Sequence, residues 1–198
     1  MIKFPIKLFF WIVKIKFIYL TKKNKNKLFL GNKINFWGLP ILSFTHKSSV
    51  YIGNKVTFRS NSKWNSLGIN HPCILSTLSS DAEIIIGDEV GMSGVSICAM
   101  KKICVGNKTL IGANVKIMDT DFHPIASTNR LYEKISMSDC AEVNIGSNVF
   151  IGANSLILKG VKIGDNSVIG AGSIVIKSIP ENVIAAGNPC KIIRSLNE

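Results

Sequence analysis

A repeat of six residues between positions 145 and 175 constrains this chain more than any other feature. Branched aliphatic residues recur at every sixth position: Ile145, Ile151, Ile157, Ile163, Ile169 and Val175. A second series of smaller side chains follows four positions after each of them: Val149, Ser155, Val161, Ser167 and Ser173. This period matches neither a helix nor a two-faced strand. It predicts a chain that turns a corner every six residues, so that each coil has three short faces and an apolar interior.

The same pattern can be followed backwards with less regularity. Ile52-Gly53 and Ile86-Gly87 resemble the later corners, and Met92 and Cys98 continue the spacing. One extra residue near 101–102 then moves the register to Val105. We expect a coil over 50–180, a connector over 31–49 and a C-terminal tail over 181–198. The stretch 59–80 fits either a degenerate coil or a loop.

Positive charge is concentrated at the front of the chain. The net charge is +12, and residues 1–80 hold thirteen Lys or Arg and no acid. Residues 1–30 predict an amphipathic helix whose apolar run is shorter than the roughly 20 residues that span a bilayer. No small-residue cleavage site follows it, which disfavours a signal peptide. We expect residues 1–27 to lie on an anionic membrane surface, or alternatively to pack on the protein's own oligomer. The sequence has no nucleic-acid-binding motif.

The five cysteines show no paired spacing. None of the intervals between Cys73, Cys98, Cys104, Cys140 and Cys190 is the short CxxC type. This disfavours a zinc site and a disulfide framework, so no metal is expected and a reducing, cytoplasmic location is favoured.

A long interruption of the repeat, residues 119–143, carries the candidate catalytic group. His123 stands there beside Asp119, Asp121 and Pro124. A neutral imidazole can take a proton from a hydroxyl group near neutral pH, and a carboxylate can orient it. Most surface histidines are inert, but a loop on a rigid scaffold is a common place for function. We therefore predict His123 as a general base, with Asp119 and Asp121 as its catalytic partners.

Three features together resemble a known family. They are the Ile-Gly hexads, the sequence TDFHP at 120–124 followed by Arg130, and the ending GAGSIVIKSIPENVIAAGNPCKIIR. Over about residues 50–195 the chain resembles the hexapeptide-repeat acyltransferases, in the branch of maltose, galactoside and serine O-acetyltransferases and their polysaccharide-modifying relatives. The resemblance implies an all-β-dominated fold, a left-handed parallel β-helix with a protruding loop. It also implies a homotrimer with sites between subunits and acetyl-CoA as co-substrate.

The resemblance also assigns residues. His123 matches the family's base, which deprotonates an acceptor hydroxyl for direct attack on the thioester. The resemblance implies that the main chain of Ala153 and Ala171 contacts the cofactor and that Ile176 and Lys177 lie at the end of its groove. It implies that Lys191 and Arg194 lie near the cofactor phosphates. Ala153 and Ala171 are eighteen residues apart, so three hexads place them one above the other.

The acceptor region departs from the family. The acceptor-contacting Asn and Asp of the sugar acetyltransferases are not evident around Gly91–Ser96. The remaining candidates for substrate binding are Ser93, Ser96, Arg130 and His71. His71 stands before Pro72 and fits a structural turn as well as a site.

These features favour an O-acetyltransferase that moves an acetyl group from acetyl-CoA to a sugar hydroxyl. The basic front suggests surface polysaccharide or lipid-linked glycan synthesis at the inner face of the cytoplasmic membrane. Two alternatives stay open: an N-acetyltransferase on an amino-sugar nucleotide, and a non-catalytic β-helix scaffold. A γ-type carbonic anhydrase is disfavoured, because it needs three zinc-binding histidines and the spacings of the three here do not fit.

Overall fold

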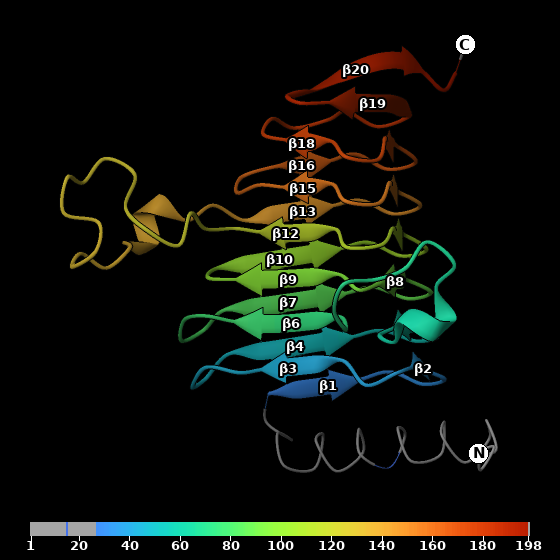
Figure 1. Cartoon of the computed structure of the whole chain (residues 1–198), viewed down its shortest axis with the longest axis horizontal. Coiled ribbons are helices and arrows are strands. Elements are labelled where there is room, and N and C mark those ends of the chain that lie inside the picture. Colours follow the sequence, from blue (N-terminus) through green and yellow to red (C-terminus); the bar gives the residue numbers. More distant parts are fainter. Residues whose placement is uncertain (1–14, 16–26, 198) are drawn as a thin grey trace.

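The computed structural model describes residue 15 and residues 27–197, which stack short strands into a three-sided coil (Figure 1). Sheet A contains β1 (Leu28–Leu30), β4 (Ser49–Ile52), β7 (Glu83–Ile86), β10 (Lys102–Val105), β13 (Val143–Ile145) and β16 (Lys162–Ile163). Sheet B contains β2 (Asn35–Trp37), β5 (Thr57–Arg59), β8 (Gly91–Ser93), β11 (Leu110–Ile111), β14 (Phe150–Ile151), β17 (Val168–Ile169), β19 (Val183–Gly187) and β20 (Cys190–Ser195). Sheet C contains β3 (Ile41–Ser43), β6 (Ile74–Thr77), β9 (Ser96–Ala99), β12 (Lys116–Met118), β15 (Leu156–Ile157) and β18 (Ile174–Val175). The expectation of a parallel β-helix is confirmed.

The hexads determine the register of the coils, as predicted. Ile145 pairs with Ile163, Ile151 with Ile169, and Ile157 with Val175, each across one coil of eighteen residues. All six side chains are buried and form the core that runs along the coil. The small residues of the second series are buried too, and their serine hydroxyls bond to carbonyls at the corners: Ser155 Oγ lies 2.9 Å from Gly152 O, and Ser173 Oγ donates to Gly170 O at 2.6 Å.

The first coil begins earlier than the sequence suggested. Residues 31–49 were expected to be a connector, but they contain β2 and β3. Leu30, Phe36 and Leu42 are themselves six residues apart and pair with the next coil. The middle member of the series, Phe36 in β2, is aromatic and stacks on Phe58 at 5.6 Å, so a pattern sought in branched aliphatic residues missed it.

One inward-facing position and the C-terminal tail also differ from expectation. Cys98 was expected to face the interior, but Ile97 does, because the chain takes five residues rather than six from Met92 to the next inward position. The tail expected over 181–198 begins with the antiparallel hairpin of β19 and β20, which ends the stack. The helix expected in residues 1–30 falls almost wholly outside the described residues, and Leu28–Leu30 are a strand. In the described part of the chain, no helix has the length and apolar character needed to cross a bilayer.

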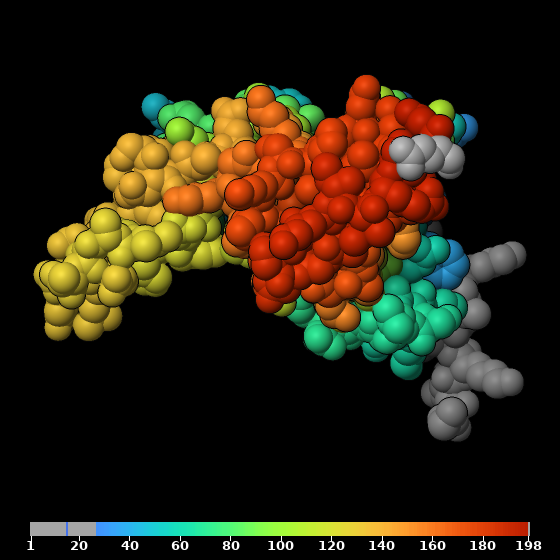
Figure 2. All heavy atoms as spheres, turned by 90° about the horizontal axis from the view of Figure 1, so that it is seen from above, coloured from blue at the N-terminus to red at the C-terminus, as the bar shows by residue number. Residues whose placement is uncertain are grey.

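Three corners connect the sheets, and two of them carry insertions. We call them the A–B, B–C and C–A corners after the sheets that the chain leaves and joins. Residues 119–143, hereafter the arm, leave the C–A corner after β12 and contain the 3-10 helix η2 (Met137–Asp139). Residues 60–73, hereafter the short loop, interrupt the chain between β5 and β6 and contain η1 (Ser62–Trp64). The stretch 59–80 was expected to be either a degenerate coil or a loop, and it contains both, because the short loop is inserted into a coil. In Figure 2 the yellow arm and the teal short loop project from different sides of the body.

Candidate functional site

The arm begins with a buried carboxylate. The Asp119 side chain accepts hydrogen bonds from the backbone amides of Met100 (2.6 Å), Lys101 (2.7 Å) and Lys102 (2.8 Å). These amides belong to the widened C–A corner of the preceding coil. Burial raises the pKa of Asp119 above its ordinary value, while the amide donors act in the opposite direction. The carboxylate thus fixes the root of the arm to the coil.

A lysine from the next coil holds the two ends of the arm together. Lys159 forms an ion pair with the carboxylate of Asp121, and its Nζ donates to the carbonyl of Asp139 at 2.7 Å. Ala141 N also donates to Asp119 O at 3.0 Å. Lys159 was not predicted as a functional residue. Its place at a corner gave no signal, because its partners come from an insertion whose path the repeat does not specify.

His123 lies beyond this anchor on the exposed part of the arm. Its ring makes no hydrogen bond to any described residue, so it is open to an incoming group. The guanidinium of Arg130 donates to Ile125 O at 2.7 Å and so braces the arm itself. Large apolar side chains of the arm are exposed, including Leu131 (80%) and Tyr132 (79%). A surface of this kind is typical of a contact region.

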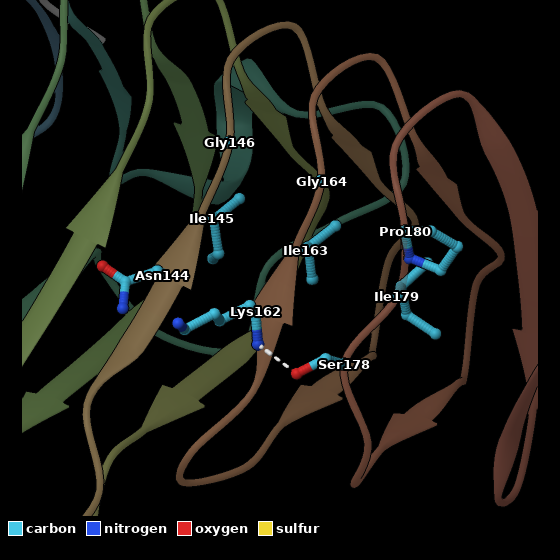
Figure 3. Close-up of a pocket in the computed structure, with 9 residues that line it drawn as sticks. All are labelled: Asn144, Ile145, Gly146, Lys162, Ile163, Gly164, Ser178, Ile179 and Pro180. Atoms are coloured by element: carbon cyan, nitrogen blue, oxygen red, sulfur yellow. Dashed lines mark hydrogen bonds between the residues drawn. The ribbon is translucent and has the colours of Figure 1, made fainter.

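Two hollows lie near these elements without containing any predicted site residue. One, of about 650 Å³, lies between the arm root and the C–A corner, and its walls include the Glu83–Lys102 ion pair at 2.8 Å. The other, of about 510 Å³, lies on the outer face of β13 and β16 beside Lys162, whose amide donates to Ser178 Oγ at 3.0 Å (Figure 3). The first adjoins the root of the arm, whereas the second follows the sheet A surface.

The predicted main-chain cofactor residues stack as expected. Ala153 and Ala171 occupy the B–C corner in successive coils, and Gly172 N donates to Ala153 O at 2.8 Å. β20 starts at Cys190, which pairs with Gly187, and Gly187 N donates to Ser173 Oγ at 3.1 Å. Lys191 therefore lies near this corner, whereas Arg194 lies further along β20. Both side chains are exposed.

The other predicted cofactor residues lie at a different corner. Ile176 and Lys177 follow β18, so they belong to the C–A corner, the same corner from which the arm and His123 project. Sheet C separates this corner from Ala153 and Ala171. A single chain therefore presents the predicted site as two half-sites at opposite ends of sheet C.

The candidate acceptor residues are also divided. Ser96 and His71 meet at the B–C corner, with Ser96 Oγ 3.5 Å from His71 Nε2. Ser93 is nearby in sequence but buried, with 6% of its surface exposed, so little of it faces solvent. Arg130 lies on the arm and bonds to Ile125 there, and the arm and the short loop project from different sides of the coil (Figure 1). The structure thus brings two of the four candidates together.

Comparison with known proteins agrees with this architecture. Residues 142–177 match the model of the bacterial transferase hexapeptide family (six repeats). The predicted resemblance to the hexapeptide-repeat acetyltransferases is confirmed. The galactoside O-acetyltransferase of Lactococcus lactis is 47% identical over 96 residues, which are 48% of this chain and 44% of that protein. The polysialic acid O-acetyltransferase of Neisseria meningitidis is 32% identical over 126 residues, 58% of this chain and 57% of that one.

A solved structure supports the same relationship. A galactoside acetyltransferase in complex with coenzyme A has a TM-score of 0.53 and 32% identity, covering 84% of this chain and 65% of its own. The fold is accordingly the left-handed parallel β-helix that the resemblance implied. The chain spans about half the length of the curated relatives that it matches.

Proposed function

We propose that this protein transfers an acetyl group from acetyl-CoA to a hydroxyl group of a sugar. The observation that carries the proposal is an open histidine on an arm anchored at both ends to a hexapeptide coil. The similarity to a galactoside acetyltransferase complexed with coenzyme A supports the donor. The galactoside and polysialic acid acceptors in the names of two relatives support the acceptor class.

In the proposed reaction His123 acts as the general base. Its unprotonated ring nitrogen takes the proton from the acceptor hydroxyl, and the oxygen attacks the thioester carbonyl carbon. The tetrahedral oxyanion is stabilised by backbone amides of the coil. Collapse breaks the C–S bond, and the imidazolium returns its proton to the departing thiolate. The products are the acetyl ester and free CoA, with no covalent enzyme intermediate.

The two aspartates fit positioning roles in this scheme. Asp119 receives three backbone amides, and Asp121 is paired with Lys159, so both carboxylates act on the arm rather than on the reacting atoms. In this proposal the two aspartates, predicted as catalytic partners of His123, hold the arm so that the imidazole is correctly positioned. A displacement of about 1 Å in such a group can cost about 10²-fold in rate.

We further propose that the protein works as a homotrimer. The two half-sites at opposite ends of sheet C meet when the B–C corner of one copy approaches the C–A corner of another. The exposed apolar side chains of the arm support such a contact. In this arrangement Ala153 and Ala171 of one copy and Ile176 and Lys177 of another would line one groove, with Lys191 and Arg194 available to phosphates.

The test is release of CoA from acetyl-CoA with panels of hydroxyl and amino sugars. We expect hydroxyl sugars to be acetylated, and His123→Ala to lose about 10²–10⁴-fold in rate while CoA still binds. His46→Ala is the matched control, because His46 is an exposed histidine outside the arm. Turnover of amino sugars alone would favour N-acetylation, and failure of the wild-type protein to bind CoA would favour a scaffold.

A further inference from the structure

The short loop lines an open hollow whose walls carry no charged side chain. The hollow has a volume of about 230 Å³ and lies beside the B–C corner. Its lining includes the polar side chains of Asn61, Ser62, Asn70 and His71 and the apolar ones of Ile69 and Pro72. The lining contains no Lys, Arg, Asp or Glu. Neutral donors and acceptors beside apolar carbon suit an uncharged polyhydroxylated unit, such as one sugar ring.

His71 is oriented within this hollow. Its Nδ1 lies 2.8 Å from the carbonyl oxygen of Pro72. A carbonyl can only accept, so Nδ1 carries the hydrogen and the neutral ring presents Nε2 as an acceptor. The hydroxyl of Ser96 approaches Nε2 only at 3.5 Å, the outer limit of a hydrogen bond. Nε2 can therefore accept a hydrogen bond from a ligand hydroxyl.

The short loop is attached to the same column of corners that carries the predicted cofactor residues. Asn70 N donates to Asn114 Oδ1 at 2.8 Å, and Asn114 Nδ2 approaches Asn154 Oδ1 at 3.4 Å. Asn154 is the neighbour of Ala153. The loop also covers Gly94, where an added Cβ would lie 2.9 Å from the carbonyl oxygen of His71. The hollow is thus fixed on the N-terminal side of the half-site at the B–C corner.

Height along the coil relates this hollow to the arm. Asn114 and Met118 belong to one coil, and the arm leaves that coil directly after Met118. In a cyclic assembly whose axis runs along the coil, equivalent levels of different copies face one another. The hollow of one copy then stands within about one coil, roughly 5 Å in height, of the root of another copy's arm.

We propose that His71 and the hollow of one copy bind a sugar unit of the acceptor whose hydroxyl is activated by His123 of a second copy. This rests on the proposed function and makes His71 a specificity-determining residue. The imidazole of His71 accepts a hydrogen bond from a second hydroxyl of the acceptor and takes no part in the proton transfer. The acceptor class is accordingly a glycan with at least one neutral sugar unit.

The first measurement separates acceptor binding from catalysis. We expect His71→Ala to raise the acceptor KM about ten-fold, the size of one lost hydrogen bond, with the KM for acetyl-CoA unchanged. His71→Gln, which keeps an acceptor atom, should restore part of the affinity. His46→Ala should match the wild type. An unchanged acceptor KM in both His71 variants would refute the proposal.

The second measurement tests whether the two histidines meet between copies. His71→Ala and His123→Ala chains carrying different tags are co-expressed, and assemblies holding both tags are isolated. Every mixed trimer keeps both histidines in about one third of its sites if these come from different copies, so activity at low acceptor concentration should recover to about that fraction of the wild-type activity. If both come from one copy, activity stays near half of the His71→Ala rate and the proposal fails. Absence of any sugar-dependent CoA release in the wild type would instead refute the proposed function.

Discussion

At the scale of single residues, close approach between coils explains why the corners need glycine. A Cβ added at Gly164 would lie 2.3 Å from the backbone nitrogen of Glu181 in the next coil. Gly172 is glycine for another reason, since its φ is +69° and nothing lies within 4 Å of an added Cβ. Only the three-dimensional stacking distinguishes the steric requirement at Gly164 from the conformational one at Gly172.

These two glycines give a matched pair of substitutions. Gly164→Ala should lower the free energy of unfolding by about 3 kcal/mol, because the backbone of the neighbouring coil must move. Gly172→Ala should cost about 1–2 kcal/mol, the strain of a left-handed conformation. Gly172→Asn should recover most of that loss, since asparagine tolerates this region. Urea denaturation measures all three, and equal losses for the two alanine variants would contradict the distinction.

Asp119, which was predicted as catalytic, bonds to three backbone amides of the preceding coil and should therefore contribute to stability. Asp119→Ala leaves three backbone amides without their acceptor, so we expect a loss of about 3 kcal/mol in unfolding free energy. Asp119→Asn keeps one accepting oxygen and should lose less. Glu142→Ala, an exposed neighbour, should stay within about 0.5 kcal/mol of the wild type. An Asp119→Ala protein as stable as the wild type in urea denaturation would show that the amides find other partners.

At the scale of elements, the sequence predicted the regular coils and the position of the arm, but not the contacts that hold the arm in place. The series from Ile145 to Val175 specifies its own register, because each side chain must point inward and pair one coil away. The arm was located by the break in this series, but its anchors were not. Asp119 bonds to amides 17 to 19 residues earlier, and Lys159 reaches back 38 residues to Asp121, contacts that exist only once the coils are stacked. The irregular stretch 59–80 likewise indicated the short loop, but the contact between His71 and the carbonyl of Pro72 that orients the ring follows from no sequence pattern.

The anchor formed by Lys159 can be tested separately from the coil. Lys159→Met removes the link between the two ends of the arm, so we expect kcat to fall about ten-fold as His123 loses its position. The free energy of unfolding should change by less than about 1 kcal/mol, because the pair is partly exposed. Lys159→Arg should retain most activity, and Lys116→Met, an exposed change on sheet C, should have no effect. A fall in stability that accounts for the whole loss of activity would contradict a positioning role.

At the scale of the whole molecule, positive charge is concentrated in residues 1–80, ahead of the later coils. All thirteen Lys and Arg of residues 1–80 lack acidic neighbours in sequence up to Asp81, whereas the later coils are balanced. Eight of the thirteen precede residue 28. The coil itself starts where the backbone carbonyl of Lys27 accepts Val50 N at 2.7 Å, so these eight precede the first strand and the other five lie among the first coils. We propose that residues 1–26 hold the enzyme at an anionic membrane, where a lipid-linked acceptor would be presented to it.

This last proposal predicts a separation of binding from folding. Deletion of residues 1–26 should abolish sedimentation with vesicles containing phosphatidylserine, while the unfolding transition in urea persists because the hydrogen bond of Lys27 is retained. Replacement of Lys22, Lys23 and Lys25 by Gln should weaken vesicle binding by about 1 kcal/mol per charge, and added salt should weaken wild-type binding in the same direction. Vesicles of phosphatidylcholine alone serve as the control for purely apolar insertion. If the deleted and full-length proteins sediment equally with anionic vesicles, the positive charge of the front does not act on a membrane, and packing of this segment on the oligomer becomes the better account.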